Sequence, residues 1–229
     1  FMLIGLPNGD GSFTATLFMP FEDFEKLTKP AHVKEFFEKW FPDCASNNFA
    51  LMPTLVEDFF ANPTSPLLNI KISPWHYEDK LLLLGDAAHA TVPFYGQGMN
   101  AGFEDALFLH EMLERNGGDI KKTFEQMSEE LVPSRAGLCD VSMQNYVEMR
   151  SKTNSRLFAL KKTVDWALES LFPNSWNHLY GMVTFSRKPY HKALQQAEQQ
   201  DKILAGALAL CVTGVTVIGA TLLRRGMRG

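Results

Sequence analysis

The sequence predicts an α/β protein in which an antiparallel sheet precedes the edge of a doubly wound α/β domain and helices complete the chain. Three observations support this fold class. Apolar and polar residues alternate over residues 1–20, as in a β-hairpin. Four consecutive leucines at residues 81–84 are typical of a strand buried on both faces. Most of the remainder has the 3.6-residue periodicity of helices.

The composition excludes several classes of protein. Of the 229 residues, 45% are hydrophobic and 21% charged, which is typical of a globular chain. The formal net charge of -4 argues against a nucleic-acid-binding protein, which needs a clustered basic surface. Cys44, Cys139 and Cys211 form no CxxC pair, and the histidines form no HxxxH pair. The sequence therefore predicts no disulfide framework and no metal site.

Residues 1–74 form the first predicted domain. Apolar runs flank a turn at residues 8–11, which indicates a hairpin. Helical periodicity follows over residues 21–60, with Val33, Phe37 and Trp40 on one apolar face. Residues 68–72 return to the alternation of a strand. We expect these elements to form part of a small sheet domain that covers a substrate.

The next predicted domain, residues 75–117, contains the most informative stretch of the sequence. Residues 81–105 read LLLLGDAAHATVPFYGQGMNAGFED. Ligands of α/β sheets bind beyond the carboxyl ends of the strands, where Asp86 could accept hydrogen bonds from ligand hydroxyls. Gly96 and Gly98 lack a Cβ, so the backbone could approach a flat ligand closely. A plain strand–turn–helix explains any one of these residues, but their combination favours a ligand site.

A helix is predicted over residues 98–114. Its free N–H groups and positive dipole end would face the ligand and stabilise negative charge there. The apolar periodicity predicts an inner face of five residues. They are Phe103, Ala106, Leu107, His110 and Leu113.

Residues 118–200 form a predicted helical region. Gly117 and Gly118 end the preceding helix, and Asp119 can cap the next one, which we expect Pro133 to end. Residues 134–172 are helical by periodicity. A last helix is predicted to start at Pro189, a favourable residue for a first turn.

Residues 203–223 contain no charged residue. A helix of that length reaches roughly 30 Å, the thickness of the hydrocarbon core of a bilayer. The alternative is a buried core helix, although core helices rarely run this far without a charge. Arg224, Arg225 and Arg228 follow the segment. We expect a transmembrane tail anchor.

The order GDAAH, Pro, GQGMN, Gly and Glu-Asp resembles the second flavin-binding motif of the class A flavoprotein monooxygenases. That motif is highly specific for the superfamily. The resemblance implies a class A hydroxylase fold, in which residues 75–117 are the C-terminal part of the FAD-binding domain. It also implies FAD and NADPH as cofactors and O2 as a reactant. Asp86 would bind the ribityl or ribose part of FAD, and Gly98, Met99 and Asn100 would lie against the isoalloxazine ring.

Further segments narrow the resemblance within this family. SFTATLFMPFEDFEKL, QNYVEMR, LYGMVTFSR and the hydrophobic C-terminal segment are similar to members that hydroxylate L-kynurenine. This implies substrate contacts from Asn145 and Tyr180. Pro93, Phe94 and Met149 are candidates for the apolar wall beside the substrate ring.

The residues themselves support one of these contacts more than the other. Asn145 falls on a helical stripe with Leu138, Val141 and Met149, and a buried amide needs partners that a ligand could provide. An asparagine bonded within the core is an equally good interpretation of that pattern. For Tyr180, the sequence alone favours a packed aromatic residue.

No catalytic residue is assigned. His89 lies in the motif, but we expect it to be a structural, hydrogen-bonded loop residue. The GxGxxG phosphate-binding motif of the family is absent, because Pro7 and the hairpin exclude the glycines at residues 5–11. We therefore expect this chain to be the C-terminal part of an enzyme, unable by itself to retain FAD or hydroxylate a substrate.

The resemblance implies an enzyme of the mitochondrial outer membrane whose catalytic part faces the cytosol, with the endoplasmic reticulum as the competing location. Two other functions remain open at this point. One is a class A monooxygenase that acts on a quinone precursor or a phenolic acid. The other is a non-catalytic, membrane-tethered interaction protein.

Overall fold

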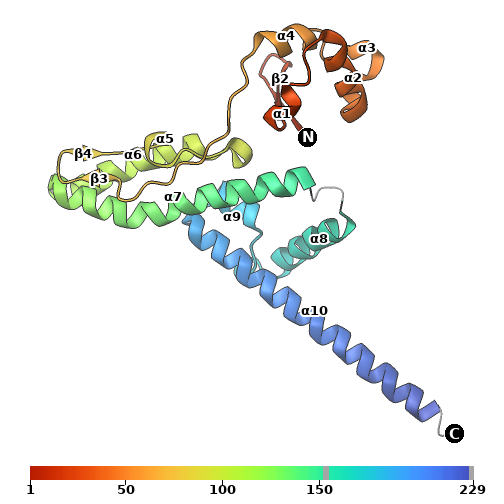
Figure 1. Ribbon diagram of the computed structural model, residues 1–229. Helices are drawn as coiled ribbons and strands as arrows, with labels where there is room; N and C mark the ends of the chain where they lie inside the picture. Colours follow the sequence, from red (N-terminus) through yellow and green to blue (C-terminus); the bar gives the residue numbers. More distant parts are fainter. Residues whose placement is uncertain (152–154, 227–229) are drawn as a thin grey trace. The chain divides into compact units, whose positions relative to one another are not determined.

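The computed structural model describes residues 1–151 and 155–226; the side chains of Leu157, Leu208 and residues 210–226 are not described. The chain divides into two compact units, Phe1–Leu67 and Leu68–Gly229 (Figure 1).

The first unit begins with the predicted hairpin. Strand β1 (Met2–Pro7) pairs antiparallel with β2 (Phe13–Phe18), from Met2 opposite Phe18 to Pro7 opposite Phe13. The turn is closed by a hydrogen bond from the Asn8 amide to the Ser12 carbonyl, 2.8 Å long. Gly11 adopts a φ of 85°, which glycine tolerates without steric cost.

Four short helices complete this unit: α1 (Phe21–Phe24), α2 (Pro30–Trp40), α3 (Pro42–Phe49) and α4 (Leu55–Ala61). Their core is built from buried apolar side chains of α2, α3 and α4. These are Val33, Phe37, Phe49 and Leu55. The predicted apolar face is confirmed at Val33 and Phe37, whereas Trp40 is 50% exposed.

The second unit contains less sheet than the sequence predicts. Strands β3 (His76–Tyr77) and β4 (Leu81–Leu82) form a two-stranded antiparallel sheet, and Leu81 is half exposed. The sequence predicts a parallel strand buried on both faces at residues 81–84. That prediction is wrong for the described part of the chain, where β4 pairs with an antiparallel neighbour and has no parallel one. The strand expected at residues 68–72 is also wrong. Among the described residues, the backbone hydrogen bonds from this segment to another one are limited to two, from the amides of Ile70 and Ile72 to the carbonyls of Ala90 and Ala88.

A loop with two short helices, α5 (Asp86–His89) and the 3-10 helix η1 (Pro93–Tyr95), leads from β4 to α6 (Gly98–Arg115). Helix α6 confirms the predicted start, and Gly117 and Gly118 end it with positive φ angles. Its predicted inner face is wrong: Phe103 is 70% exposed and Leu107 45% exposed. The buried side is instead formed by Ala101, Asp105 and Met112.

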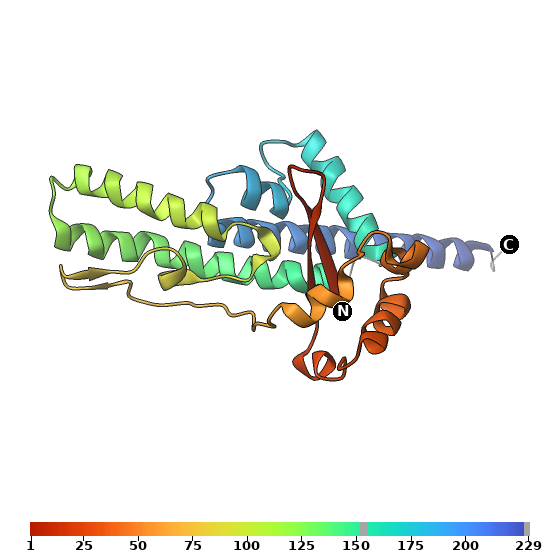
Figure 2. The ribbon, with the colours of Figure 1, turned by 90° about the horizontal axis from the view of Figure 1, so that it is seen from above.

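The reason is the position of α7 (Ile120–Ser151), which runs beside α6 in both views (Figures 1 and 2) and covers its Asp105 side. Asp119 caps α7 as predicted, since its Oδ1 accepts a hydrogen bond from the Lys122 amide at 3.0 Å. Pro133 does not end α7, contrary to the prediction. A proline removes one i→i−4 hydrogen bond and its ring crowds the preceding turn, but the buried Leu131, Ser134 and Leu138 hold the helix on both sides of it.

Helix α8 (Arg156–Leu171) is separate from α7, so the helical segment predicted over residues 134–172 is divided in two. Two more helices follow, α9 (Leu179–Phe185) and α10 (Tyr190–Gly226). The predicted start of the last helix is confirmed, because the Pro189 carbonyl accepts from the amides of Lys192 and Ala193.

Helix α10 packs closely against α7 at its first turn. The Tyr190 amide donates to Ser134 Oγ at 3.1 Å. A Cβ added at Gly137 would lie 2.6 Å from the His191 backbone nitrogen, so only glycine permits this approach. Leu138, Val141 and Ala193 form the adjacent core.

Among the residues that the structure describes, none of the helices has a long enough apolar stretch to span a membrane. Most of the predicted anchor at residues 203–223 lies outside the residues with described side chains.

We expect Gly137→Ala to destabilise the protein by about 1–3 kcal/mol, the usual cost of forcing a methyl group into a packed interface. The measurement is the free energy of unfolding in urea, followed by circular dichroism. Gly206→Ala is the matched control, because nothing lies within 4 Å of its added Cβ. There alanine should stabilise α10 by at most about 1 kcal/mol. Equal effects of the two substitutions would contradict the close contact of α7 and α10.

Candidate functional site

A buried ionic cluster stands at the centre of the second unit. Asp105 of α6 is fully buried, and His89 and Arg135 are each 2% exposed. His89 Nε2 lies 2.5 Å from Asp105 Oδ2, and Arg135 Nε lies 2.8 Å from Asp105 Oδ1. Because an ionised carboxylate only accepts, the His89 Nε2–H donates to it. Trp75 packs on the imidazole, with 5.2 Å between ring centroids.

The cluster joins three segments of the chain. Asp105 Oδ2 also accepts from the Gly85 amide at 3.1 Å, which fixes the start of the loop. Arg135 of α7 reaches the Ala101 carbonyl at 3.4 Å and the Glu104 carboxylate at 2.9 Å. The loop, α6 and α7 are therefore held by one carboxylate and one guanidinium.

The pKa of Asp105 reflects these partners. Burial acts to raise the pKa of this carboxyl group, because it disfavours the charged form. The hydrogen bond from His89 and the positive charge of Arg135 act in the opposite direction and outweigh burial, so the pKa is lowered from its ordinary value. Asp105 is thus a buried carboxylate that is kept ionised by its neighbours.

Two glycines give the loop its path. Gly85 has a φ of 56°, and a Cβ added at Gly102 of α6 would lie 3.6 Å from the Gly85 Cα. The loop therefore passes directly over the first turns of α6. Gly96 is left-handed, with a φ of 66°, and nothing lies within 4 Å of an added Cβ there. This backbone is open for the close approach of a ligand.

The N-terminus of α6 is also open. No side chain caps it, and Met99 is 72% exposed. Asn100 is exposed as well and donates from Nδ2 to Gln97 Oε1 at 3.0 Å. Asp86, exposed at the start of α5, lies at the other end of the same loop. The four residues predicted to bind the cofactor thus occupy the two ends of one loop, which the buried cluster fixes in place.

Three of the residues predicted to contact substrate lie together. Asn145 Nδ2 donates to the Phe94 carbonyl at 2.8 Å and lies 3.5 Å from the Met149 sulfur. Asn145 therefore connects α7 to η1. Tyr146, which the sequence analysis did not single out, stacks on Phe94 with 4.6 Å between ring centroids. Its position next to Asn145 in QNYVEMR was the available signal.

Tyr180 of α9 approaches this group through a second aromatic pair. Its ring stacks on Tyr95, with 5.9 Å between centroids and an interplanar angle of 25°, and it remains 51% exposed. Burial raises the pKa of Tyr95 to about 12, so this hydroxyl stays protonated. Pro93 is exposed at the first position of η1. Asn145 and Tyr180 thus both contact η1, through Phe94 and Tyr95.

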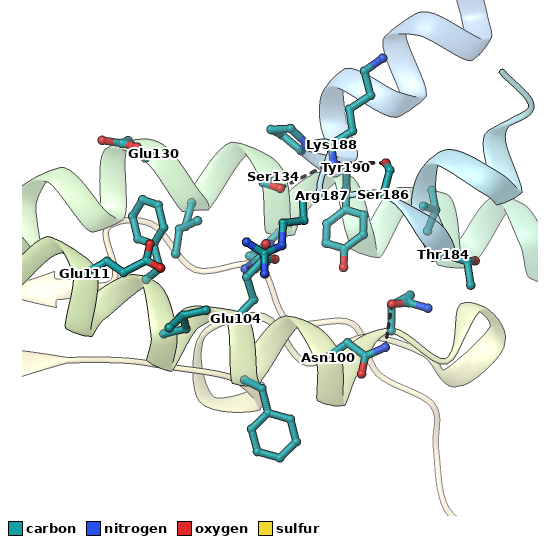
Figure 3. Close-up of a pocket in the computed structure, with 18 residues that line it drawn as sticks. Asn100, Glu104, Glu111, Glu130, Ser134, Thr184, Ser186, Arg187, Lys188 and Tyr190 are labelled. Carbon is teal, nitrogen blue, oxygen red and sulfur yellow. Dashed lines mark hydrogen bonds and ion pairs between the residues drawn. The ribbon is translucent and has the colours of Figure 1, made fainter. Parts of the chain in front are cut away.

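A separate cleft of about 610 Å³ opens between α6, α7 and the connection from α9 to α10 (Figure 3). Glu104 and Glu111 line its α6 side, and Arg187 and Lys188 come from the connection. Of the predicted site residues, Asn100 alone is among the described residues that line it. The cleft is therefore distinct from the aromatic group around η1.

Comparison with known protein families gives one match, an FAD binding domain at residues 69–116. This range contains the loop, the glycines and α6. The match indicates the class A flavoprotein hydroxylase fold, mostly helical here and with small sheets.

Relatives define the family further. The chain is 48% identical over 92% of its length to kynurenine 3-monooxygenase of Flavobacterium johnsoniae, 45% over 91% to that of Sus scrofa, and 43% over 96% to that of Caenorhabditis elegans. It covers 47%, 44% and 47% of those proteins, and so spans about half of their length. The chain is thus similar over nearly its whole length to kynurenine 3-monooxygenases, which confirms the resemblance found in the sequence.

We expect Asp105→Asn to destabilise the protein by about 3–5 kcal/mol, because it removes the buried carboxylate partner of the buried Arg135. Glu104→Gln is the control: its carboxylate also pairs with Arg135 but is 42% exposed, so it should cost at most about 1 kcal/mol. The free energy of unfolding in urea measures both. Similar losses of unfolding free energy for the two variants would show that the buried pair contributes no more to stability than the exposed one.

Asp105 also gives stability a dependence on pH. Its folded pKa lies below the unfolded value of 3.8, so its contribution is fully present above that value. The contribution is lost as the pH falls through the lower, folded pKa. The unfolding free energy of the unmodified protein should therefore drop more steeply below pH 4 than that of Asp105→Asn. Parallel pH profiles would contradict this linkage.

Proposed function

We propose that this chain is part of an FAD- and NADPH-dependent monooxygenase that hydroxylates L-kynurenine to 3-hydroxykynurenine. The observation that supports it most is the loop from Asp86 to Asn100, with its buried anchor at Asp105, inside the segment matched by an FAD binding domain. The names of the relatives supply the substrate.

The residues present fit a flavin. The uncapped N-terminus of α6 presents backbone N–H groups, and its dipole favours an anionic partner. Gly96 leaves space where a Cβ would otherwise project. In this proposal Gly98, Met99 and Asn100 lie along the ring system, and the Asp86 carboxylate accepts from the hydroxyls of the sugar or ribityl chain. Bound FAD supplies the activation of oxygen.

The chain's own residues orient the substrate beside that ring. Phe94 and Met149 provide an apolar wall, and Pro93 extends it at the start of η1. Asn145 uses its Nδ2 for the Phe94 carbonyl, which leaves its Oδ1 to accept a hydrogen bond from the amino-acid group of kynurenine. Tyr180 offers a further hydroxyl, held by its stacking on Tyr95. Orientation of this kind, with exclusion of water, is the contribution expected of the protein.

The test of this function uses the full-length protein with NADPH and O2. L-kynurenine should accelerate NADPH oxidation, with stoichiometric formation of 3-hydroxykynurenine. A phenolic acid serves as the control for a different class A substrate. An unchanged rate of NADPH oxidation with L-kynurenine, or acceleration without hydroxylated product, would contradict the proposal.

Asn145→Ala should raise the KM for L-kynurenine by roughly 5- to 100-fold, the equivalent of one lost hydrogen bond in a buried site. The FAD content should change little, since Asp105 and not Asn145 fixes the start of the loop. Gln144→Ala is the matched control, because Gln144 is exposed one position earlier on α7. Steady-state kinetics with both variants would reveal the difference, and a normal KM in Asn145→Ala would remove Asn145 from the substrate site.

The uncharged segment at residues 203–223 supports a further part of the proposal, a tail anchor in the mitochondrial outer membrane with the catalytic part in the cytosol. The segment is long enough to span the hydrocarbon core as a helix and is followed by Arg224, Arg225 and Arg228.

A fluorescent protein fused to residues 190–229 should therefore localise to the mitochondrial surface. Val215→Arg should release the fusion, because a charge at the centre of a spanning helix costs about 2.5–3.5 kcal/mol for insertion. Localisation to the endoplasmic reticulum would correct the destination. Diffuse fluorescence of the unmodified fusion would contradict anchoring itself.

A further inference from the structure

From Leu160 onward, helix α8 carries an exposed face without charge, and the exposed Arg156 lies one turn earlier on the same side. At roughly 100° per residue, the residues on this face occupy one side of the helix. They are Leu160, Thr163, Val164, Ala167, Ser170 and Leu171. Leu160 is 60% exposed and Leu171 71% exposed, and Trp166, also 71% exposed, lies at the edge of the face. An exposed apolar surface of this kind marks a site of interaction.

The charged residues that follow Arg156 lie on the other side of α8, and Lys161 among them attaches the helix to α10. Lys161 Nζ lies 2.8 Å from Asp201 Oδ1 and 3.3 Å from Asp165 Oδ2. Trp176, which is 9% exposed, donates from Nε1 to Asp165 Oδ1 at 3.3 Å and so fixes the chain that follows α8. The uncharged face is thus not the face that packs within this unit.

The contact of Lys161 with Asp201 determines which surface the uncharged face of α8 can meet. The uncharged segment starts at Ile203, two positions after Asp201, and Ile203 is 62% exposed. If residues 203–223 enter a bilayer, Asp201 stands at the membrane surface, and Lys161 holds α8 at that same level. An amphipathic helix at this depth buries its apolar face at the boundary of headgroups and acyl chains. An exposed tryptophan beside basic residues is also typical of that boundary.

We propose that α8 lies on the surface of the lipid bilayer with its uncharged face, from Leu160 to Leu171, against the lipid. This interaction rests on the proposed tail anchor, and it gives the catalytic part a second contact with the membrane. It would restrict rotation of that part about α10, since two separate segments then contact the same surface.

The test is site-specific photocrosslinking in the full-length protein, reconstituted into phosphatidylcholine vesicles with a fraction of phosphatidylserine. Benzoylphenylalanine replaces Leu171 in the test variant and Lys162 in the control, which lies on the charged side of the same helix. After irradiation, mass spectrometry identifies lipid or protein adducts. Flotation of the vesicles reports membrane anchoring, and kynurenine-dependent NADPH oxidation reports folding and function separately.

The proposal predicts several-fold more lipid adduct at position 171 than at position 162, with both variants floating with the vesicles. Protein adducts at position 171, or equal lipid adducts at the two positions, in protein that floats would overturn the proposal while leaving the anchor intact. Failure to float would overturn the anchor and the lipid contact together, whatever the enzymatic activity.

Discussion

Asp105 accepts hydrogen bonds from the Gly85 amide, from His89 and from Arg135, and the rest of the second unit depends on this one carboxylate. It lies where α6, α7 and the loop meet, at a position fully shielded from water. A single uncompensated charge there would cost several kcal/mol, a substantial part of the stability of a domain. The arrangement is stable only when all partners are present, and it therefore specifies one path for the loop.

That path determines the candidate flavin site. With its first residue fixed by Asp105 and its last at the start of α6, the loop is held at both ends, and Gly96 supplies the left-handed turn before α6. His89 serves this anchoring, which agrees with the structural role expected for it. The result is an open helix terminus next to an aromatic group that Asn145 ties to α7. The residues proposed to contact cofactor and substrate thus share one support, as the orientation of two reactants requires.

Local patterns in the sequence predicted the local structure well. The hairpin, the cap at Asp119 and the starts of α6 and α10 each depend on residues within a few positions of one another. Pairings between distant segments were not predictable in the same way. The sequence around Asp105 does not indicate that Arg135, thirty positions away, is its partner. The apolar side chain of Phe103 likewise does not indicate that this residue is exposed. The predicted parallel strand failed for the same reason, because a strand buried on both faces is defined by neighbours elsewhere in the chain.

Hydrogen exchange in residues 85–98, followed by mass spectrometry, tests most directly whether the buried cluster holds this loop in place. In Asp105→Asn, under conditions where the protein remains folded, exchange in this loop should accelerate markedly, while the helices of the first unit exchange as before. Unchanged protection of the loop in that variant would contradict the account, because some other contact would then hold the site in place.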